Sequence, residues 1–124
     1  EVDSDARLDH YEVVRVLPSD EAGFSEIELM KLFRGYGYKV IGGTEVIEHG
    51  NIMAVRYSYK KSSTHYTITC NLVDDATQRA LAAISAIGWD RDWYTGHTSP
   101  NRAKAWQNLV AEMGKVVPKR TVSQ

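Results

Sequence analysis

The chain has 124 residues, of which 43% are hydrophobic and 25% are charged, and its formal net charge is −1. These values are typical of one globular domain with a real core, and they exclude a wholly disordered chain. The near-neutral charge argues against a dedicated nucleic-acid binder and against a polybasic membrane-surface module. Since Cys70 is the single cysteine, no intramolecular disulfide forms, and composition leaves the redox compartment open.

The ends of the chain differ in charge from its middle. We predict a disordered acidic tail over residues 1–8, a single α+β domain over residues 9–115, and a basic tail over residues 116–124. No apolar run approaches the ~18 residues that a membrane span needs. The chain starts at Glu1, not at methionine, which we interpret as a weak sign of an exported or periplasmic protein.

The first half of the chain predicts a strand, a helix and a second strand. His10–Leu17 is rich in β-branched residues and stops at Pro18. Ser25 and Glu28 form a capping box that starts a helix, which ends near Gly35. Residues 38–48 favour one strand with a bulge at Gly42–Gly43, and a hairpin at that pair is the alternative.

Alternating side chains over residues 51–60 and 63–73 are the clearest pattern in the sequence. This pattern is typical of antiparallel strands with one buried face and one solvated face. The two faces alternate as Met53, Val55, Tyr57 and Tyr59 against Ala54, Arg56, Ser58 and Lys60, and as Tyr66, Ile68, Cys70 and Leu72 against His65, Thr67, Thr69 and Asn71. Ile68, Cys70 and Leu72 should therefore be buried while their polar neighbours are more exposed. His65 falls on the opposite face from Cys70, so the two do not form a thiol–imidazole pair.

The C-terminal half predicts two helices separated by a loop. Asp74 or Asp75 is expected to cap a helix that ends at Gly88. A loop then spans residues 88–99. Ser99 is expected to cap the last helix, with Pro100 at its first position. That helix should end at Gly114 and bury a stripe of four side chains, namely Ala103, Trp106, Val110 and Met113.

The resulting element order is β-α-β-β-β-α-α. An apolar sheet face must be covered, and the helices are available to cover it. We therefore predict a two-layer α+β sandwich, with about four mainly antiparallel strands and two to three helices on one face.

Arg34-Gly35-Tyr36-Gly37-Tyr38 resembles the start of the signature strand of RNA-recognition motifs, in which exposed aromatic rings stack on bases. The similarity ends with this pentapeptide, because Lys39 replaces the aliphatic residue that should follow. The segment also spans a helix end and a strand start, and not the middle of a strand. We therefore expect the tyrosines to serve strand entry, and we expect no nucleic-acid binding.

The loop over residues 89–97 is the main candidate site. It combines three aromatic side chains, two carboxylates and a histidine: Trp89, Asp90, Asp92, Trp93, Tyr94 and His97. Such a loop suits contact with a ligand or a partner's side chains. Alternatively, its aromatic residues pin the loop to the core and Asp90 pairs with Arg91. We expect Trp89 to be the anchor and Trp93 and Tyr94 to be the more exposed pair.

Two functions remain open from the sequence. The first is a non-enzymatic binding or protein-interaction domain, such as an exported bacterial accessory, inhibitor or immunity-type protein, with a protein or small ligand as its partner. The second is a small enzyme or ligand-binding domain with a pocket under the loop, where His97 acts as a base and Asp92 orients it. We expect no metal and no cofactor, because no histidine shows ligand spacing.

Overall fold

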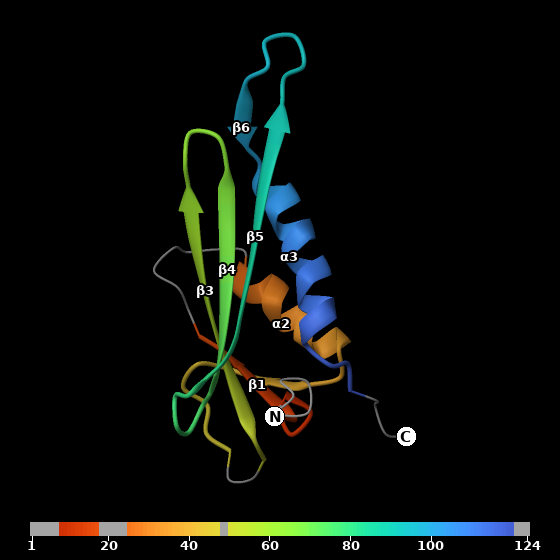
Figure 1. Ribbon diagram of the computed structural model, residues 1–124. Coiled ribbons are helices and arrows are strands. Elements are labelled where there is room, and N and C mark those ends of the chain that lie inside the picture. Colours follow the sequence, from red (N-terminus) through yellow and green to blue (C-terminus); the bar gives the residue numbers. More distant parts are fainter. Residues whose placement is uncertain (1–7, 18–24, 48–49, 121–124) are drawn as a thin grey trace, which may run out of the picture.

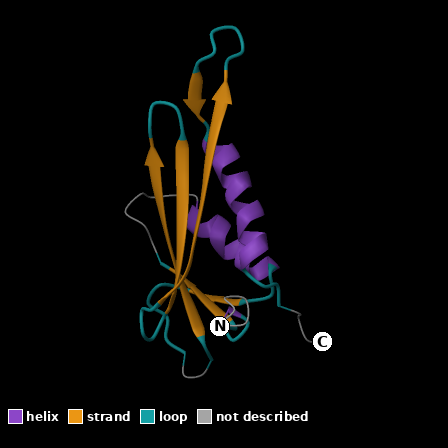
Figure 2. Cartoon of the chain, viewed as in Figure 1, coloured by secondary structure: helices purple, strands orange, loops and turns teal. Residues whose placement is uncertain are grey.

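The computed structural model describes residues 8–17, 25–47 and 50–120 (Figures 1 and 2). Their strands are β1 (Val13–Val16), β2 (Lys39–Ile41), β3 (Ile52–Lys61), β4 (Tyr66–Asp74), β5 (Ala80–Arg91) and β6 (Thr98–Pro100). Two helices are described, α2 (Ser25–Gly35) and α3 (Arg102–Val116). The fold class is α+β, as predicted.

The strands form one mixed sheet in the order β2-β1-β3-β4-β5-β6. β1 pairs in parallel with both β2 and β3, and the other pairs are antiparallel. The parallel pair of β1 and β2 follows from their connection through α2, since parallel neighbours need a crossover. The described sheet has six strands, and the prediction of about four missed β5 and β6.

Both helices lie on the same side of the long strands β3, β4 and β5 (Figure 2). Phe33 and Leu29 of α2 and Leu109 and Met113 of α3 are fully buried against the sheet. A helix layer on one face leaves the other face open, so apolar side chains alternate with polar ones along the strands. Ile68 is accordingly buried.

In the central hairpin, β4 confirms the alternation that the sequence predicted, whereas in β3 it fails at Ala54, which is buried along with Met53 and Val55. Ile68, Cys70 and Leu72 are buried, whereas Asn71 is exposed and the threonines beside it are half-buried. In contrast, the expected bulge at Gly42–Gly43 is wrong. β2 ends at Ile41, and the two glycines lie in a turn that the backbone of Glu45 closes.

The helix predicted from Asp74 to Gly88 is instead the turn at residues 74–79 followed by strand β5. The carboxylate of Asp74 does accept backbone N–H groups, but those of Ala76 and Thr77 in a tight turn where Gln78 has a positive φ of 63°. β5 then lies along β4, where Ile84 faces the core. Pairing with β4 overrides the helix propensity of its alanines.

α3 begins two residues later than predicted and continues past Gly114 to Val116. Asn101 is its N-cap, since its side chain accepts the Lys104 amide at 2.9 Å, while Ser99 and Pro100 belong to β6. The buried stripe is therefore shifted from the predicted one, and it consists of Ala105, Leu109 and Met113.

Packed residues extend beyond both predicted domain boundaries. Leu8 and Val117 are buried, and the hydroxyl of Tyr38 donates to the carbonyl of Pro118 at 2.8 Å. Tyr36 and Tyr38 are themselves core residues, with edge-to-face contacts to Phe33. Their rings are thus covered within the domain. The predicted cap side chain of Ser25 lies outside the described residues.

Candidate functional site

The predicted loop at residues 89–97 is a hairpin that projects from the body of the protein. β5 and β6 pair with Trp89 opposite Pro100, Asp90 opposite Ser99, and Arg91 opposite Thr98. This hairpin, residues 89–100, extends past the end of the β3–β4 hairpin (Figure 1). We call it the finger.

The turn at the tip of the finger is closed by its own hydrogen bonds. The Asp92 amide donates to the His97 carbonyl at 2.8 Å, and the Gly96 amide donates to the Asp92 carbonyl at 2.6 Å. The Asp92 carboxylate accepts the Tyr94 amide at 2.9 Å. Gly96 has a φ of +75°, a conformation that costs glycine little. The sequence Asp92–His97 therefore specifies a defined turn.

Two aromatic rings stand in solvent at this tip. Trp93 is 79% exposed and Tyr94 is 82% exposed, and the two rings stack with centroids 4.3 Å apart and planes at 25°. Trp89, nearer the body, is 39% exposed. This ranking agrees with the expectation that Trp93 and Tyr94 are the outer pair, although Trp89 is only a partial anchor.

The base of the finger is fixed to the start of α3. Asp90 forms an ion pair with Lys104 at 2.8 Å, and its other carboxylate oxygen accepts Asn101 Nδ2 at 2.6 Å. These hydrogen bonds, that of Lys104 first, lower the pKa of Asp90. Asp90 therefore pairs with Lys104 and not, as the sequence had suggested, with Arg91. The packing of α3 against Gly88 brings Lys104 close to Asp90.

Asp92 and His97 do not make the contacts that a general base and its orienting carboxylate would make. One Asp92 oxygen accepts the Tyr94 amide, and the hydrogen bond between Asp92 and His97 joins their backbone atoms. Both residues are exposed. Surface hollows of about 400, 320 and 100 Å³ in the described part of the chain are lined by residues outside the finger.

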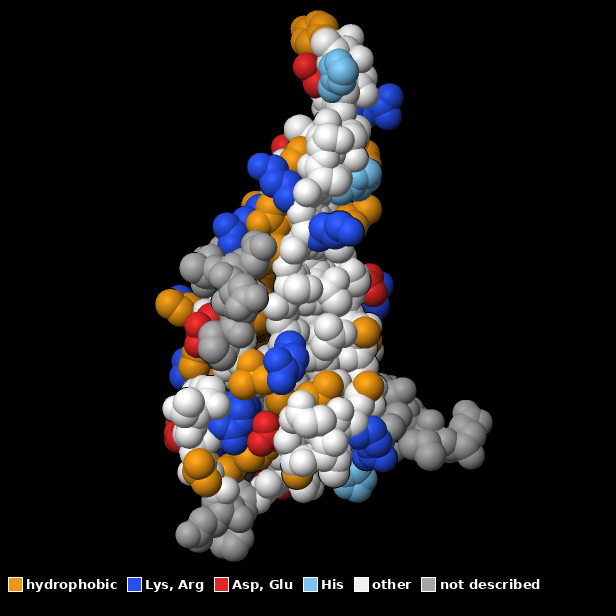
Figure 3. Space-filling model, turned by 90° about the vertical axis from the view of Figure 1, so that its left-hand side faces the viewer, with side chains coloured by type: hydrophobic (Ala, Val, Ile, Leu, Met, Phe, Trp, Pro, Cys, Tyr) orange, Lys and Arg blue, Asp and Glu red, His pale blue; other side chains and the backbone are white. Residues whose placement is uncertain are grey.

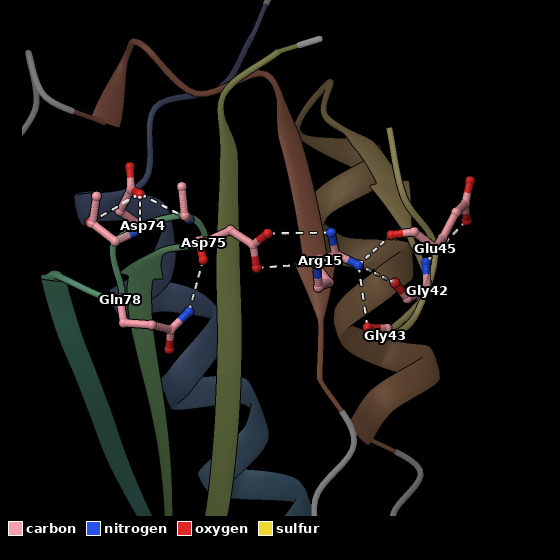
Figure 4. Close-up of polar contacts among 9 residues, drawn as sticks. Arg15, Gly42, Gly43, Glu45, Asp74, Asp75 and Gln78 are labelled. Atoms are coloured by element: carbon pink, nitrogen blue, oxygen red, sulfur yellow. Dashed lines mark hydrogen bonds and ion pairs between the residues drawn. The ribbon is translucent and has the colours of Figure 1, made fainter. Parts of the chain in front are cut away.

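A second polar cluster lies on the solvated face of the sheet (Figure 4). Arg15 of β1 donates from Nε and Nη2 to the carboxylate of Asp75, at 3.1 and 3.3 Å, and from Nη1 to the carbonyls of Gly42, Gly43 and Glu45. The guanidinium is thus occupied on both sides. It joins the turn after β2 to the turn after β4, which indicates a structural role.

Metal-ligating side chains are not clustered in the part of the chain that the structure describes: no group of three or more His, Cys, Asp or Glu residues is suitably placed. Cys70 is fully buried, and burial raises the pKa of its thiol to about 12. A thiol of that pKa is a poor nucleophile near neutral pH. Within the same described residues, neither helix has the length and apolarity to cross a membrane.

Sequence reasoning found the aromatic residues of the finger but missed the residues that hold it. Asn101 and Lys104 were not singled out, because Ser99-Pro100 offered a stronger-looking helix start. The available signal was Asn101 itself, which is as good an N-cap residue as serine. Gly88 was interpreted as a helix terminator, whereas it provides room for Ala105 of α3.

Few similarities link this chain to known proteins. No protein-family model matches the chain, and no curated protein matches it. Among solved structures, the chain is similar to a PelC dodecamer from Paraburkholderia phytofirmans, with 15% sequence identity and a TM-score of 0.45. That match covers 91% of this chain and 88% of the PelC chain.

Proposed function

We propose that this protein is a non-enzymatic binding domain and that the finger is its binding element. The observation that carries the proposal is the stacked pair of Trp93 and Tyr94, each about four-fifths exposed at the tip of a hairpin. Large aromatic side chains dominate the binding energy of protein interfaces. Burial of apolar surface stabilises a protein by ~25 cal/mol per Å², so rings that stay in water add no such stability to the isolated domain.

The finger is also organised before it meets a partner. Hydrogen bonds close its turn, and Asp90 ties its base to Asn101 and Lys104. A rigid element loses little conformational entropy on binding, so more of the contact energy appears as affinity. Burying about 300 Å² of ring surface would contribute roughly 7 kcal/mol before the costs of association. This supports recognition by insertion into a concave partner.

The shape of the site favours binding over catalysis. A catalytic pocket needs groups that converge on one point in a cleft, whereas the finger is a projection whose side chains point outward into solvent. Asp92 serves the turn and not the His97 ring. An accessory, inhibitor or immunity-type role remains the prediction made from the sequence, since such proteins act through exposed surfaces of this kind.

The experiment compares the wild-type domain with the double variant Trp93→Ala/Tyr94→Ala, each immobilised and exposed to native extract. We expect proteins retained by the wild type to be lost from the variant, because its contact surface is gone. The free energy of unfolding in urea should change by less than about 0.5 kcal/mol, as is usual for exposed positions. The stability measurement shows whether any loss of binding is direct.

A matched control removes two exposed apolar side chains far from the finger in the sequence, Ile27 and Val46. The Ile27→Ala/Val46→Ala domain should retain the same proteins as the wild type. If the finger variant retains them too, the finger is not the binding element. If the finger variant loses more than about 2 kcal/mol of stability, its rings belong to the fold and the proposal fails.

A further inference from the structure

The finger end of the molecule carries a local positive charge that the whole-chain value conceals. Lys60 and Lys61 end β3, and Arg102 and Lys104 begin α3. We call these four residues the basic collar. No Asp or Glu occurs in residues 58–67 or 100–106, although the chain as a whole has a net charge of −1. The carboxylate of Asp90 also lies beside the basic collar, where it forms an ion pair with Lys104.

The strand register places the collar at the base of the finger. Lys61 lies opposite Tyr66, and Tyr66 lies opposite Gly88, the residue just before the finger. β5 continues for three residues past Gly88, roughly 10 Å at the rise of a strand, and Trp93 lies beyond its end, in the turn. In Figure 3 hydrophobic side chains form the very tip, with acidic, histidine and basic side chains close below them and further basic side chains on the body. The aromatic side chains thus lie at the tip of the finger, and the basic collar lies at its base.

We propose that the partner is a protein with a deep apolar cleft whose rim carries Asp and Glu side chains. This inference rests on the proposed function of the finger. The rings would fill the floor of the cleft while Lys60 and Lys61 face the rim and Lys104 stays paired with Asp90. This arrangement matches the usual apolar centre and polar rim of interfaces. The guanidinium of Arg102 lies over the ring of Tyr59, 4.9 Å from the ring centroid, and this contact keeps the Arg102 charge at the base of the finger.

The separation of the two features favours a cleft over a flat anionic membrane. Aromatic side chains at a bilayer insert only ~5–10 Å into the boundary region. The collar would then remain above the headgroups by a distance close to the screening length of ~8 Å at physiological salt. A cleft deep enough for the finger brings its rim to the collar, so both features contribute at once.

The test first identifies the partner and then measures charge dependence with purified proteins. A benzophenone amino acid in place of Thr95, an exposed residue beside the two rings, is photo-crosslinked in native extract, and the protein joined to the finger is identified and purified. Its association rate with the unmodified domain is then measured at several salt concentrations. For Lys60→Glu/Lys61→Glu we expect an association rate about tenfold lower and a weaker dependence on salt.

The control is Lys31→Glu/Lys39→Glu, which makes the same charge change at exposed lysines of α2 and β2. Its association rate should remain within about twofold of the wild type. If Trp93→Ala abolishes binding while the Lys60→Glu/Lys61→Glu rate is unchanged, the finger binds but the acidic rim is refuted. If the benzophenone captures no protein, the proposed function fails for a protein partner. A blue shift of tryptophan emission on phosphatidylglycerol vesicles, without protein capture, overturns the cleft in favour of a lipid surface.

Discussion

Gly88 is a position where a single added methyl group should strongly disturb the fold. A Cβ built there would lie 2.1 Å from the Ala105 backbone nitrogen, 2.4 Å from the Asn101 carbonyl oxygen and 2.7 Å from the Ala105 Cα. All three atoms belong to backbone, so no side-chain rotation relieves the contact. Because ordinary contacts begin near 3.4 Å, Gly88→Ala must move α3 away from β5 by about 1 Å.

The displacement affects one of the main packing contacts of the domain. Ala105, Leu109 and Met113 are fully buried on α3, and they lose close contact with the sheet when the helix retreats. Overpacking of a core usually costs about 1–3 kcal/mol, and a backbone clash belongs at or above the upper end. We expect Gly88→Ala to lose about 3 kcal/mol, which lowers the urea midpoint by roughly 1.5–2 M.

Gly35→Ala is the matched control, because a Cβ at Gly35 meets nothing within 4 Å. Gly35 is the last residue of α2, so alanine there should leave stability within about 1 kcal/mol of the wild type. Equal urea midpoints for Gly88→Ala and Gly35→Ala would refute the close approach of α3 to β5. Unchanged backbone chemical shifts at Asn101 and Ala105 in the Gly88→Ala protein would refute it as well.

Three other predictions concern the body of the domain. Arg15→Lys should lose about 1–3 kcal/mol in urea unfolding, because lysine cannot reach both a carboxylate and three carbonyls in this geometry. The pKa of Asp74 is lowered, chiefly by the hydrogen bond from the Tyr11 hydroxyl, so its stabilisation is present above its ordinary pKa of 3.8 and is lost as pH falls further. Acid unfolding curves should therefore fall less steeply below about pH 4 for Asp74→Asn than for the wild type. Cys70 should react with a thiol reagent at pH 8 only in urea, and rapid labelling of the native protein would contradict its burial.

The parts of the fold that the sequence predicted are those specified by local patterns. Burial alternates from Ile68 to Leu72 in β4, so a slip by one residue would place Ile68 and Leu72 in solvent. The α2 helix ends at the expected glycine, Gly35. In each case neighbouring residues carry enough information to fix both the element and its buried face.

The parts that sequence reasoning missed depend on partners distant in the chain. In β5, Ala80, Ile84 and Ile87 fit helical spacing, and the same segment also fits a strand with Ile84 facing inward. The choice is made by Cys70 of β4, which lies opposite Ile84 in the antiparallel register. No window around residue 84 contains that information.

The same distinction explains the candidate site. Trp93 and Tyr94 were recognisable from composition, but whether they stand in a pocket or on a projection depends on where β5 ends relative to β4. β5 continues for three residues past Gly88, the last residue paired with β4, and β6 supports that extension.

The rigidity of the finger likewise depends on Asn101, whose amide donates to the Gly88 carbonyl while its side chain binds Asp90. Gly88 therefore serves the fold and the binding element together: by admitting α3, it brings Asn101 to the base of the finger. A substitution there should loosen the finger as it destabilises the core, whereas changes at Trp93 should alter binding alone.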